Sequence, residues 1–495
     1  MTDTLTFCMH DGHHPPGRGH HRAGALCLPC GVSAAQEHKL PKEVVERGPQ
    51  VVAVMGEGAI QHRLRVVLIA LLIGVAVGWS TTDARADACQ TQAGCVETAR
   101  SALDFTRSVG VNTHLGYSQT IYWQRYADLI RPRLLELGVS HIRDGTFPAN
   151  YPEVIGPTIA QRYRELGLGL NLLVGLEQAP SGPGGSGEGL QDRLDWIKSN
   201  GLAPQVVGIE GSNESGNDAT VIRNHQCDTF SRVHGDPAFA GKPVVGPSGG
   251  YPFSGTVWYD RIGDLSACLD VGNLHPFPGE DPPHLHQGQD LGVAAGWASR
   301  TYGGRPDWIT ENGYWTKSPD GSHVSERAAG VYVPRMFMEA FRRGFERTQA
   351  YELIDLNSAT SDVIHNYGLL RTDGTRKPAF TTVANTMRVL KDTASSSGSL
   401  GFGIVCKARC NAPIRRVLLK HSSGSFFLVV WSESRVWNGT TDTPQPTQNV
   451  NLTLHKSARM EVISPASSSA PSKTVTGTTL NTQVTDAVQL IRITP

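Results

Sequence analysis

The stretch Val206-Val-Gly-Ile-Glu-Gly-Ser-Asn-Glu214 decides how the rest of this chain is interpreted. It starts as a short apolar run, which is typical of a buried strand, and it ends in polar residues of which the last is a carboxylate. A second stretch of this kind, Trp308-Ile-Thr-Glu-Asn-Gly-Tyr-Trp315, follows later in the chain. Side chains at the C-terminal ends of the parallel strands of a barrel meet at one face, so the two stretches predict a shared site.

Eight apolar stretches alternate with amphipathic segments and predict a (β/α)8 barrel, also known as a TIM barrel. The competing architecture, a doubly wound open sheet, would carry a glycine-rich phosphate loop after its first strand. The segment Val111-Asn-Thr-His-Leu-Gly116 does not fit that loop, so the barrel is favoured. The predicted strands are 108–114, 139–144, 169–177, 206–214, 243–248, 269–275, 307–311 and 349–355.

The chain divides into a barrel and a C-terminal β domain. We predict a lead segment over residues 87–107 and the barrel over 108–392, with a final helix near its end. A serine-rich linker, 393–399, separates the barrel from residues 400–495. Short alternating apolar runs, such as 425–431, predict an all-β sandwich in this last part.

The N-terminal region predicts export. In residues 55–86, Arg63 and Arg65 precede an apolar run that ends at Trp79, and a small-x-small cleavage site follows at Ala84-Arg-Ala86. The run is shorter than the roughly 20 residues that span a bilayer, which disfavours a membrane anchor. We therefore expect a secreted protein, extracellular or periplasmic, with no stable membrane insertion after signal cleavage.

Residues 1–54 contain Cys8, the pair Cys27 and Cys30, and a run of histidines, a combination that suits zinc. Because signal peptides begin a protein, we favour a translation start at Met55 and interpret residues 1–54 as a leader outside the native fold. We expect no metal and no cofactor in the mature protein.

Six cysteines follow residue 86, and an even number in an exported chain predicts disulfides. Proximity favours Cys89–Cys95 and Cys406–Cys410, which leaves Cys227 for Cys268, although other pairings are possible. The 45 Lys+Arg residues balance 45 Asp+Glu residues. A zero net charge gives no reason to expect nucleic acid as a partner, and we expect a monomer.

Two carboxylates carry the predicted chemistry. Hydrolysis of a glycosidic bond needs one carboxyl to protonate the leaving oxygen and another to attack the sugar or activate water. Glu214 ends the fourth predicted strand and Glu311 the seventh, and strands three apart lie across the mouth of a barrel. Glu210 is the main rival to Glu214. It lies inside the strand and lacks a preceding Asn, so we expect it to point into the barrel wall.

These residues resemble known signatures. Ser-Asn213-Glu214 and Thr-Glu311-Asn-Gly are similar to the acid/base and nucleophile motifs of the clan A glycoside hydrolases, which are retaining (β/α)8 enzymes. The segment 367–380 resembles the stretch that leads into the last barrel helix of such enzymes. The resemblance covers residues 108–390, and family 39 is the nearest group. It implies a secreted retaining glycosidase that acts on a polysaccharide or oligosaccharide.

By that resemblance, Glu214 is the general acid/base, Glu311 is the nucleophile, and Asn213 contacts the sugar 2-hydroxyl. Arg143 resembles the arginine that pairs with the nucleophile and keeps it ionised, since a nearby opposite charge lowers a carboxyl pKa. His275 occupies the position of the residue that orients the nucleophile.

Further substrate-binding residues are expected around the mouth. His114 and Glu177 end other predicted strands. The resemblance implies a tryptophan platform on the eighth strand, but this chain has Tyr351 there, so Tyr351 or Trp315 is expected to replace it. Other candidates for stacking on sugars are Tyr314, Trp123, Tyr251 and Trp258.

Two other functions stay open at this point. A decayed barrel could serve as a non-catalytic carbohydrate-binding or cell-surface protein, although the carboxylate pair argues against it. A metal-dependent barrel hydrolase could use His114, His275, His284 and His286, but these lack the HxH pattern expected at a first strand. The segments 180–189 and 277–290 are expected to build cleft walls or a lid.

Overall fold

The structure is a computed structural model that describes residues 89–90, 94–148, 155–175, 189–215, 218–249, 256–286, 288–356 and 362–495. The predictions for the leader, the signal peptide, Glu177 and Tyr251 lie outside these residues, as does most of the segment 180–189.

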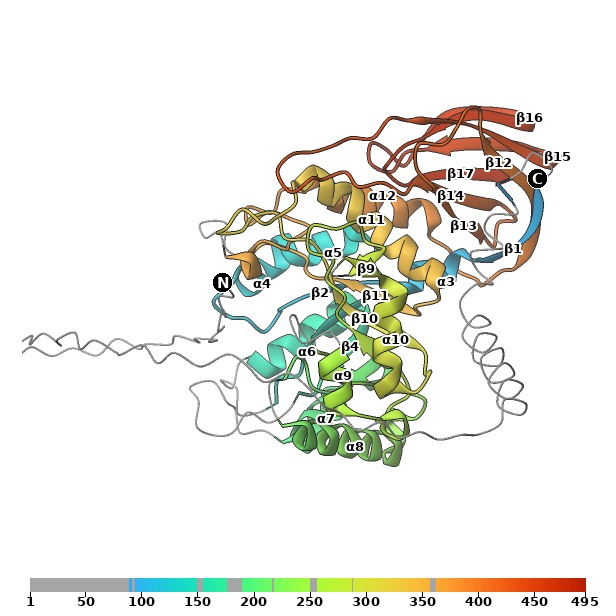
Figure 1. The fold of residues 1–495 in the computed structure, drawn as a ribbon. Coiled ribbons are helices and arrows are strands. Elements are labelled where there is room, and N and C mark those ends of the chain that lie inside the picture. Colours follow the sequence, from blue (N-terminus) through green and yellow to red (C-terminus); the bar gives the residue numbers. More distant parts are fainter. Residues whose placement is uncertain are drawn as a thin grey trace, which may run out of the picture. The chain divides into compact units, whose positions relative to one another are not determined.

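Within the described residues, eight parallel strands form the barrel that the repeats predict (Figure 1). Their order in the sheet is β6-β5-β4-β3-β2-β11-β10-β7, and a bridge between Val245 and Val271 brings the two ends together. Each predicted strand overlaps one of them. The strands are β2 (Val109–Asn112), β3 (His141–Gly145), β4 (Gly169–Leu173), β5 (Val206–Glu210), β6 (Val244–Val245), β7 (Gly272–Leu274), β10 (Asp307–Asn312) and β11 (Arg347–Ala350).

Helices cover the outside of the barrel (Figure 1). In α6 (Ile155–Leu166), apolar residues at helical spacing bury one face, including Ile159 and Tyr163. The other long helices are α7 (Leu190–Ser199), α8 (Ala219–Gly235), α9 (Thr256–Ile262), α10 (Leu291–Tyr302), α11 (Glu326–Arg343) and α12 (Pro378–Leu390).

The helical segment that ends at Gly138 is divided into three parts in the structure. It consists of α4 (Ile121–Gln124), a π-helical turn (Tyr126–Ile130) and α5 (Arg131–Leu137). Pro132 follows the π turn and has no backbone N–H to bond residue 128, so a regular α-helix loses a hydrogen bond at this point. The helix ends at Gly138, which adopts a left-handed conformation with φ of 75°.

A second sheet of seven strands lies in the described part of the chain beyond the barrel. Its order is β12-β1-β13-β14-β17-β15-β16, and β12 also pairs with β15. The strand β1 (Cys95–Ser101) comes from the predicted lead segment and lies between C-terminal strands (Figure 1). The C-terminal members are β12 (Gly398–Cys406), β13 (Ile414–Lys420), β14 (Phe426–Ser432), β15 (Gln448–Ile463), β16 (Pro471–Val484) and β17 (Gln489–Thr494).

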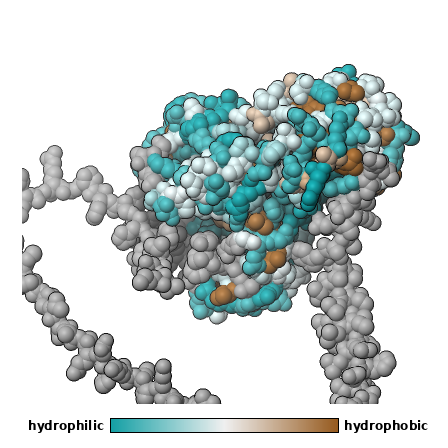
Figure 2. Space-filling model, turned by 45° about the horizontal axis from the view of Figure 1, so that its top comes forward, coloured by the Kyte–Doolittle hydropathy of each residue, from teal (hydrophilic) through white to brown (hydrophobic). Residues whose placement is uncertain are grey.

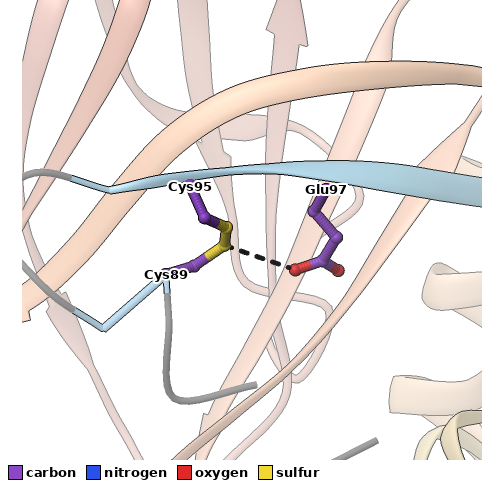
Figure 3. Close-up of side chains that lie close together, drawn as sticks. All are labelled: Cys89, Cys95 and Glu97. Atoms are coloured by element: carbon purple, nitrogen blue, oxygen red, sulfur yellow. Dashed lines mark hydrogen bonds between the residues drawn. A yellow bond between two sulfur atoms is a disulfide. The ribbon is translucent and has the colours of Figure 1, made fainter. Parts of the chain in front are cut away.

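The described cysteines form the three disulfides favoured by sequence proximity: Cys89–Cys95, Cys227–Cys268 and Cys406–Cys410. The first lies beside Glu97 of β1 (Figure 3), with Cys89 Sγ 3.7 Å from Glu97 Oε2. Arg416 donates hydrogen bonds of 2.8 and 3.0 Å to the same carboxylate oxygen. Arg416 therefore neutralises this carboxylate.

No helix of the described residues is long and apolar enough to cross a membrane. The face of the molecule in Figure 2 is mostly hydrophilic, and its hydrophobic residues lie in small separate groups. Scattered hydrophobic residues of this kind are normal for a protein surface.

Candidate active site

The two predicted glutamates meet at the C-terminal end of the barrel. Glu311 belongs to β10, and Glu214 lies in the loop that follows β5. One carboxylate oxygen of each and one ring nitrogen of His275 all lie within 4.8 Å of one another. In the ring of strands, β6 and β7 separate β5 from β10, so the two side chains converge across the mouth.

Arg143, in the middle of β3, links the site to the barrel interior. Its Nη1 donates to Glu311 Oε1 at 2.5 Å, and its Nη2 donates to Asn213 Oδ1 at 2.8 Å. Its Nη2 and Nε also donate to both carboxylate oxygens of Glu210, at 2.7 and 2.9 Å. The guanidinium is 4% exposed. One buried cation therefore holds two carboxylates and the Asn213 amide in place.

Glu210 is a structural carboxylate. It is fully buried, whereas the Glu214 side chain is 31% exposed. Besides Arg143, its oxygens accept from Asn171 Nδ2 at 2.7 Å and Asn273 Nδ2 at 3.1 Å. Burial raises the pKa of Glu210, but the charge and hydrogen bonds of Arg143 outweigh burial and hold that pKa below its usual range. Of the two rivals, only Glu214 faces the mouth.

His275, just beyond β7, shares a proton with Glu214. Its Nδ1 lies 2.7 Å from Glu214 Oε1, and its Nε2 lies 2.9 Å from Thr310 Oγ1. The Asn273 amide nitrogen faces two acceptors, Glu210 Oε1 and Gly246 O, so Asn273 Oδ1 is the atom 2.7 Å from Thr310 Oγ1.

The single hydroxyl hydrogen of Thr310 therefore points to an acceptor, either Asn273 Oδ1 or Glu210 Oε1. Since the Thr310 oxygen must then accept, His275 Nε2 carries a hydrogen. The contact between His275 Nδ1 and Glu214 consequently holds one proton, on either the ring or the carboxyl.

The backbone at Glu214 is strained. Its φ is 44°, the only positive value among the described non-glycine residues. Such a conformation costs on the order of 1 kcal/mol, and strain of this kind clusters at functional sites. Backbone hydrogen bonds to β6 and its loop hold it, with Glu214 N donating to Ser248 O at 3.0 Å and Ser248 N donating to Ser212 O at 3.0 Å.

Burial and neighbouring charges set the two carboxyl pKa values apart. Burial raises the pKa of Glu311, with Glu214 adding to the increase, and His275 and Arg143 only partly oppose it. Burial also acts to raise the pKa of Glu214, but the hydrogen bond and charge of His275 outweigh it and place that pKa below its usual range.

A cluster of aromatic rings follows strands β10 and β11. Tyr351 packs edge-on against Tyr367, with ring centres 5.2 Å apart, and Trp315 packs against Tyr367 at 5.5 Å. Tyr367 is a residue that the sequence did not single out, although it begins the segment 367–380. Burial, together with the charges of Glu311 and Glu214, raises the pKa of its hydroxyl.

The remaining predicted residues take different positions. His114 stacks on Tyr117 at 4.5 Å, and burial, aided by the charge of Arg143, lowers the pKa of His114 to about 3. Its Nε2 lies 3.3 Å from the buried carboxylate of Glu352, a residue that sequence analysis missed. Tyr314 is buried, and its hydroxyl donates to Asp281 O at 2.9 Å. It therefore supports the loop 275–290.

The loop 275–290, which contains the predicted wall segment, is attached to the C-terminal β domain. Trp437 Nε1 donates to Glu280 Oε1 at 3.2 Å, and Arg435 forms an ion pair with Asp281. His284 Nδ1 lies 2.9 Å from Glu433 Oε1. We call this set of three contacts the clamp.

The histidines of the metal hypothesis are separated by these contacts. His284 faces Glu433, and His286 Nδ1 lies 3.2 Å from Phe277 O. In the described part of the chain, two groups of three side chains have metal-ligand spacing. One is the Cys89–Cys95 disulfide with Glu97. The other is Glu214, His275 and Glu311, where the cation of Arg143 on Glu311 disfavours a second cation.

Comparison with known proteins shows the fold. The chain matches no protein-family model and no curated protein sequence. It is similar to a solved family 39 glycoside hydrolase from Bacteroides cellulosilyticus, with 14% identity, a TM-score of 0.54, and coverage of 79% of this chain and 82% of that one. It is also similar to a glucosidase from Croceicoccus marinus, with 10% identity, a TM-score of 0.50, and coverage of 82% and 100%. The chain thus shares its overall fold with solved glycoside hydrolases.

Proposed function

We propose that this protein is a secreted retaining glycoside hydrolase that cleaves O-glycosidic bonds of a polysaccharide or oligosaccharide by double displacement. The observation that carries the proposal is the approach of Glu214 and Glu311, whose nearest oxygens lie within 4.8 Å together with His275. Carboxyl groups of retaining glycosidases lie about 5–5.5 Å apart, whereas those of inverting enzymes stand about 6.5–9.5 Å apart to admit a water molecule.

Glu311 is the proposed nucleophile. Its carboxylate attacks the anomeric carbon, the bond to the leaving oxygen breaks, and a glycosyl-enzyme forms. Arg143 holds one oxygen of Glu311 at 2.5 Å, which leaves the other oxygen for the attack. The same arginine orients Asn213, whose amide is proposed to contact the sugar 2-hydroxyl.

Glu214 is the proposed general acid/base. It donates its proton to the leaving oxygen in the first step, and in the second step it removes a proton from the water that hydrolyses the glycosyl-enzyme. The proton held between Glu214 and His275 supports this role, because it can pass to the carboxyl without an exchange with bulk water.

Export and domain structure belong to the same proposal. Residues 55–86 form the proposed signal peptide, and the disulfides suit an oxidising compartment. We place the catalytic barrel at 108–392 and an all-β domain, proposed as a sandwich, at 400–495; the all-β character is supported by strands β12 to β17.

The test uses Glu311→Gln and Glu214→Gln on a panel of aryl β-glycosides and polysaccharides. We expect each variant to lose at least about 10²–10³-fold in kcat, as removal of a catalytic carboxyl does. NMR of the first product should show the anomeric configuration of the substrate. Asp218→Asn is the matched control, because Asp218 caps α8 near the site and Asn caps helices equally well.

Other outcomes separate the alternatives. Glycan binding without hydrolysis by the unmodified protein would favour a carbohydrate-binding protein. Activity that a chelator abolishes would favour a metal-dependent hydrolase. Full turnover in either glutamine variant, or a product of inverted configuration, would reject the assignment of the two glutamates.

A further inference from the structure

We infer that the sugar held between Glu214 and Glu311 is uncharged, and that the mouth of the barrel discriminates against uronic acids and other anionic sugars. This inference rests on the proposed glycosidase function and adds the substrate class. It comes from the distribution of charge around the site.

In six of the loops that follow barrel strands, the described residues include neither lysine nor arginine, although the chain has 45 such residues. Loops at this end of a (β/α)8 barrel form the substrate site. These described residues are 113–120, 146–148, 174–175, 189, 211–215, 218, 246–249, 275–286 and 288–290. They include five carboxylates: Glu214, Asp218, Glu280, Asp281 and Asp290.

The two remaining loops carry cations, and these have acidic partners of their own. Lys377 is buried and lies 2.8 Å from Asp355. Arg371 pairs with Glu326, and Arg376 Nη2 lies 2.6 Å from Glu136. Lys317 is exposed on the loop that follows β10 and also makes an interaction.

Arg143 is the cation at the centre of the site, and four of its five N–H groups already donate hydrogen bonds. Each of its three nitrogens donates to Glu210, Glu311 or Asn213. Two carboxylates surround this single positive charge, and Glu214 adds a third carboxyl. Among the described residues of the six loops, no lysine or arginine is available as a counter-ion for a sugar carboxylate at this position.

The histidines near the site are engaged as well. His275 shares its proton with Glu214, and His284 faces Glu433. His114 is neutral, since burial keeps its pKa low. A hydroxymethyl group needs only hydrogen bonds, whereas a carboxylate next to other carboxylates is repelled and poorly solvated. The site is therefore suited to neutral sugars.

The experiment compares matched pairs of 4-nitrophenyl β-glycosides that differ only at C6, such as glucoside with glucuronide and galactoside with galacturonide. We expect kcat/KM for the neutral member to exceed that for the anionic member by at least about 30-fold, as for a charge left without a partner. The ratio should fall as salt rises, because salt screens the repulsion.

A variant with an added charge shows whether charge repulsion or the shape of the site causes the preference for neutral sugars. Tyr117 is exposed in the first loop, and its ring stacks on His114. Tyr117→Arg places a cation there and should reduce the ratio of kcat/KM for the neutral member to that for the anionic member several-fold relative to Tyr117→Gln, which removes the ring without adding charge.

An equal or faster reaction of the anionic member would overturn the inference and leave the glycosidase function standing. So would a ratio that responds to neither salt nor Tyr117→Arg. Failure to cleave any neutral or anionic substrate, including polysaccharides, would instead reject the proposed function.

Discussion

His275 and Arg143 each determine the state of a carboxyl group in the proposed site. One ring nitrogen of His275 contacts Glu214. The other contacts Thr310, which in turn hydrogen-bonds Asn273, and these contacts fix the orientation of the ring. Arg143 joins Glu311 to a fully buried partner, Glu210. Both residues therefore have effects that a pH profile or an unfolding curve can measure.

Replacement of His275 by Phe should move the acidic limb of kcat/KM to higher pH. The His275 contact makes the pKa of Glu214 the lower of the two carboxyl pKa values, and the reactive form, with Glu214 protonated and Glu311 ionised, diminishes as pH falls through it. Loss of a charge-assisted hydrogen bond corresponds to about one to two pH units. His365→Gln, in the loop after β11, is the control. An acidic limb that stays in place in His275→Phe would refute the shared proton.

The alkaline limb reports on Glu311. Burial holds the pKa of Glu311 above its usual value, whereas His275 holds the pKa of Glu214 below it, so the reactive form, with Glu311 ionised and Glu214 protonated, is a minor species of the pair. Its fraction falls as pH rises through the higher of the two pKa values, so the alkaline limb of kcat/KM should lie above about 4.3, the ordinary value for glutamate. A rate profile of the unmodified enzyme tests this, and an alkaline limb below that value would contradict it.

Arg143→Met should destabilise the barrel strongly. The substitution leaves Glu210 buried without its cation, a change that costs about 3–5 kcal/mol. Urea unfolding measures the loss. Adding Glu210→Gln removes the unpaired charge and should recover part of the stability but none of the activity. If the double variant is no more stable than Arg143→Met, the ion pair is not the cause.

At the scale of elements, the loop 275–290 connects catalysis with the C-terminal domain. It begins at His275 and is held further along by the clamp. The clamp indicates a fixed wall of the mouth in this segment, not a lid that opens. We therefore expect the C-terminal domain to affect substrate binding through this loop.

A double variant, Arg435→Ala with Trp437→Phe, tests the clamp. It removes the ion pair to Asp281 and the hydrogen bond to Glu280 while it keeps most of the packing. We expect KM to rise several-fold with kcat nearly unchanged, because the loop positions substrate and does not react. Arg459→Ala, which breaks the ion pair of an exposed arginine with Glu461 away from the loop, is the control. An unchanged KM in the double variant would show that the loop 275–290 keeps its position without the clamp.

The sequence was most informative where a signal is local. Each of the eight predicted strands overlaps an observed one, because apolar runs bounded by turns report burial directly. The convergence of Glu214 and Glu311 also followed from counting strands. Tyr367, Glu352 and the clamp could not be predicted, since their roles depend on contacts between segments far apart in the chain. The π turn before Pro132 was missed because the apolar spacing continues through it.

At the scale of the whole molecule, the disulfides differ in what they constrain. Cys227–Cys268 closes a sequence separation of 41 residues, and Cys406–Cys410 one of 4. Chain entropy assigns about 4 kcal/mol to the first and about 2 kcal/mol to the second. The double variant Cys227→Ser, Cys268→Ser should therefore lower the free energy of unfolding more than Cys406→Ser, Cys410→Ser. Urea titrations compare them, and the reverse ranking would rule out the entropic account.

The position of β1 has a consequence for biosynthesis. This strand leaves the ribosome before the barrel, yet it pairs with β12 and β13, which are translated after the barrel is complete. Until then it is an unpaired strand, which makes it a target for chaperones or for pairing with another chain. Final assembly must therefore wait for the end of translation, and a C-terminal fragment produced alone would lack one of its inner strands.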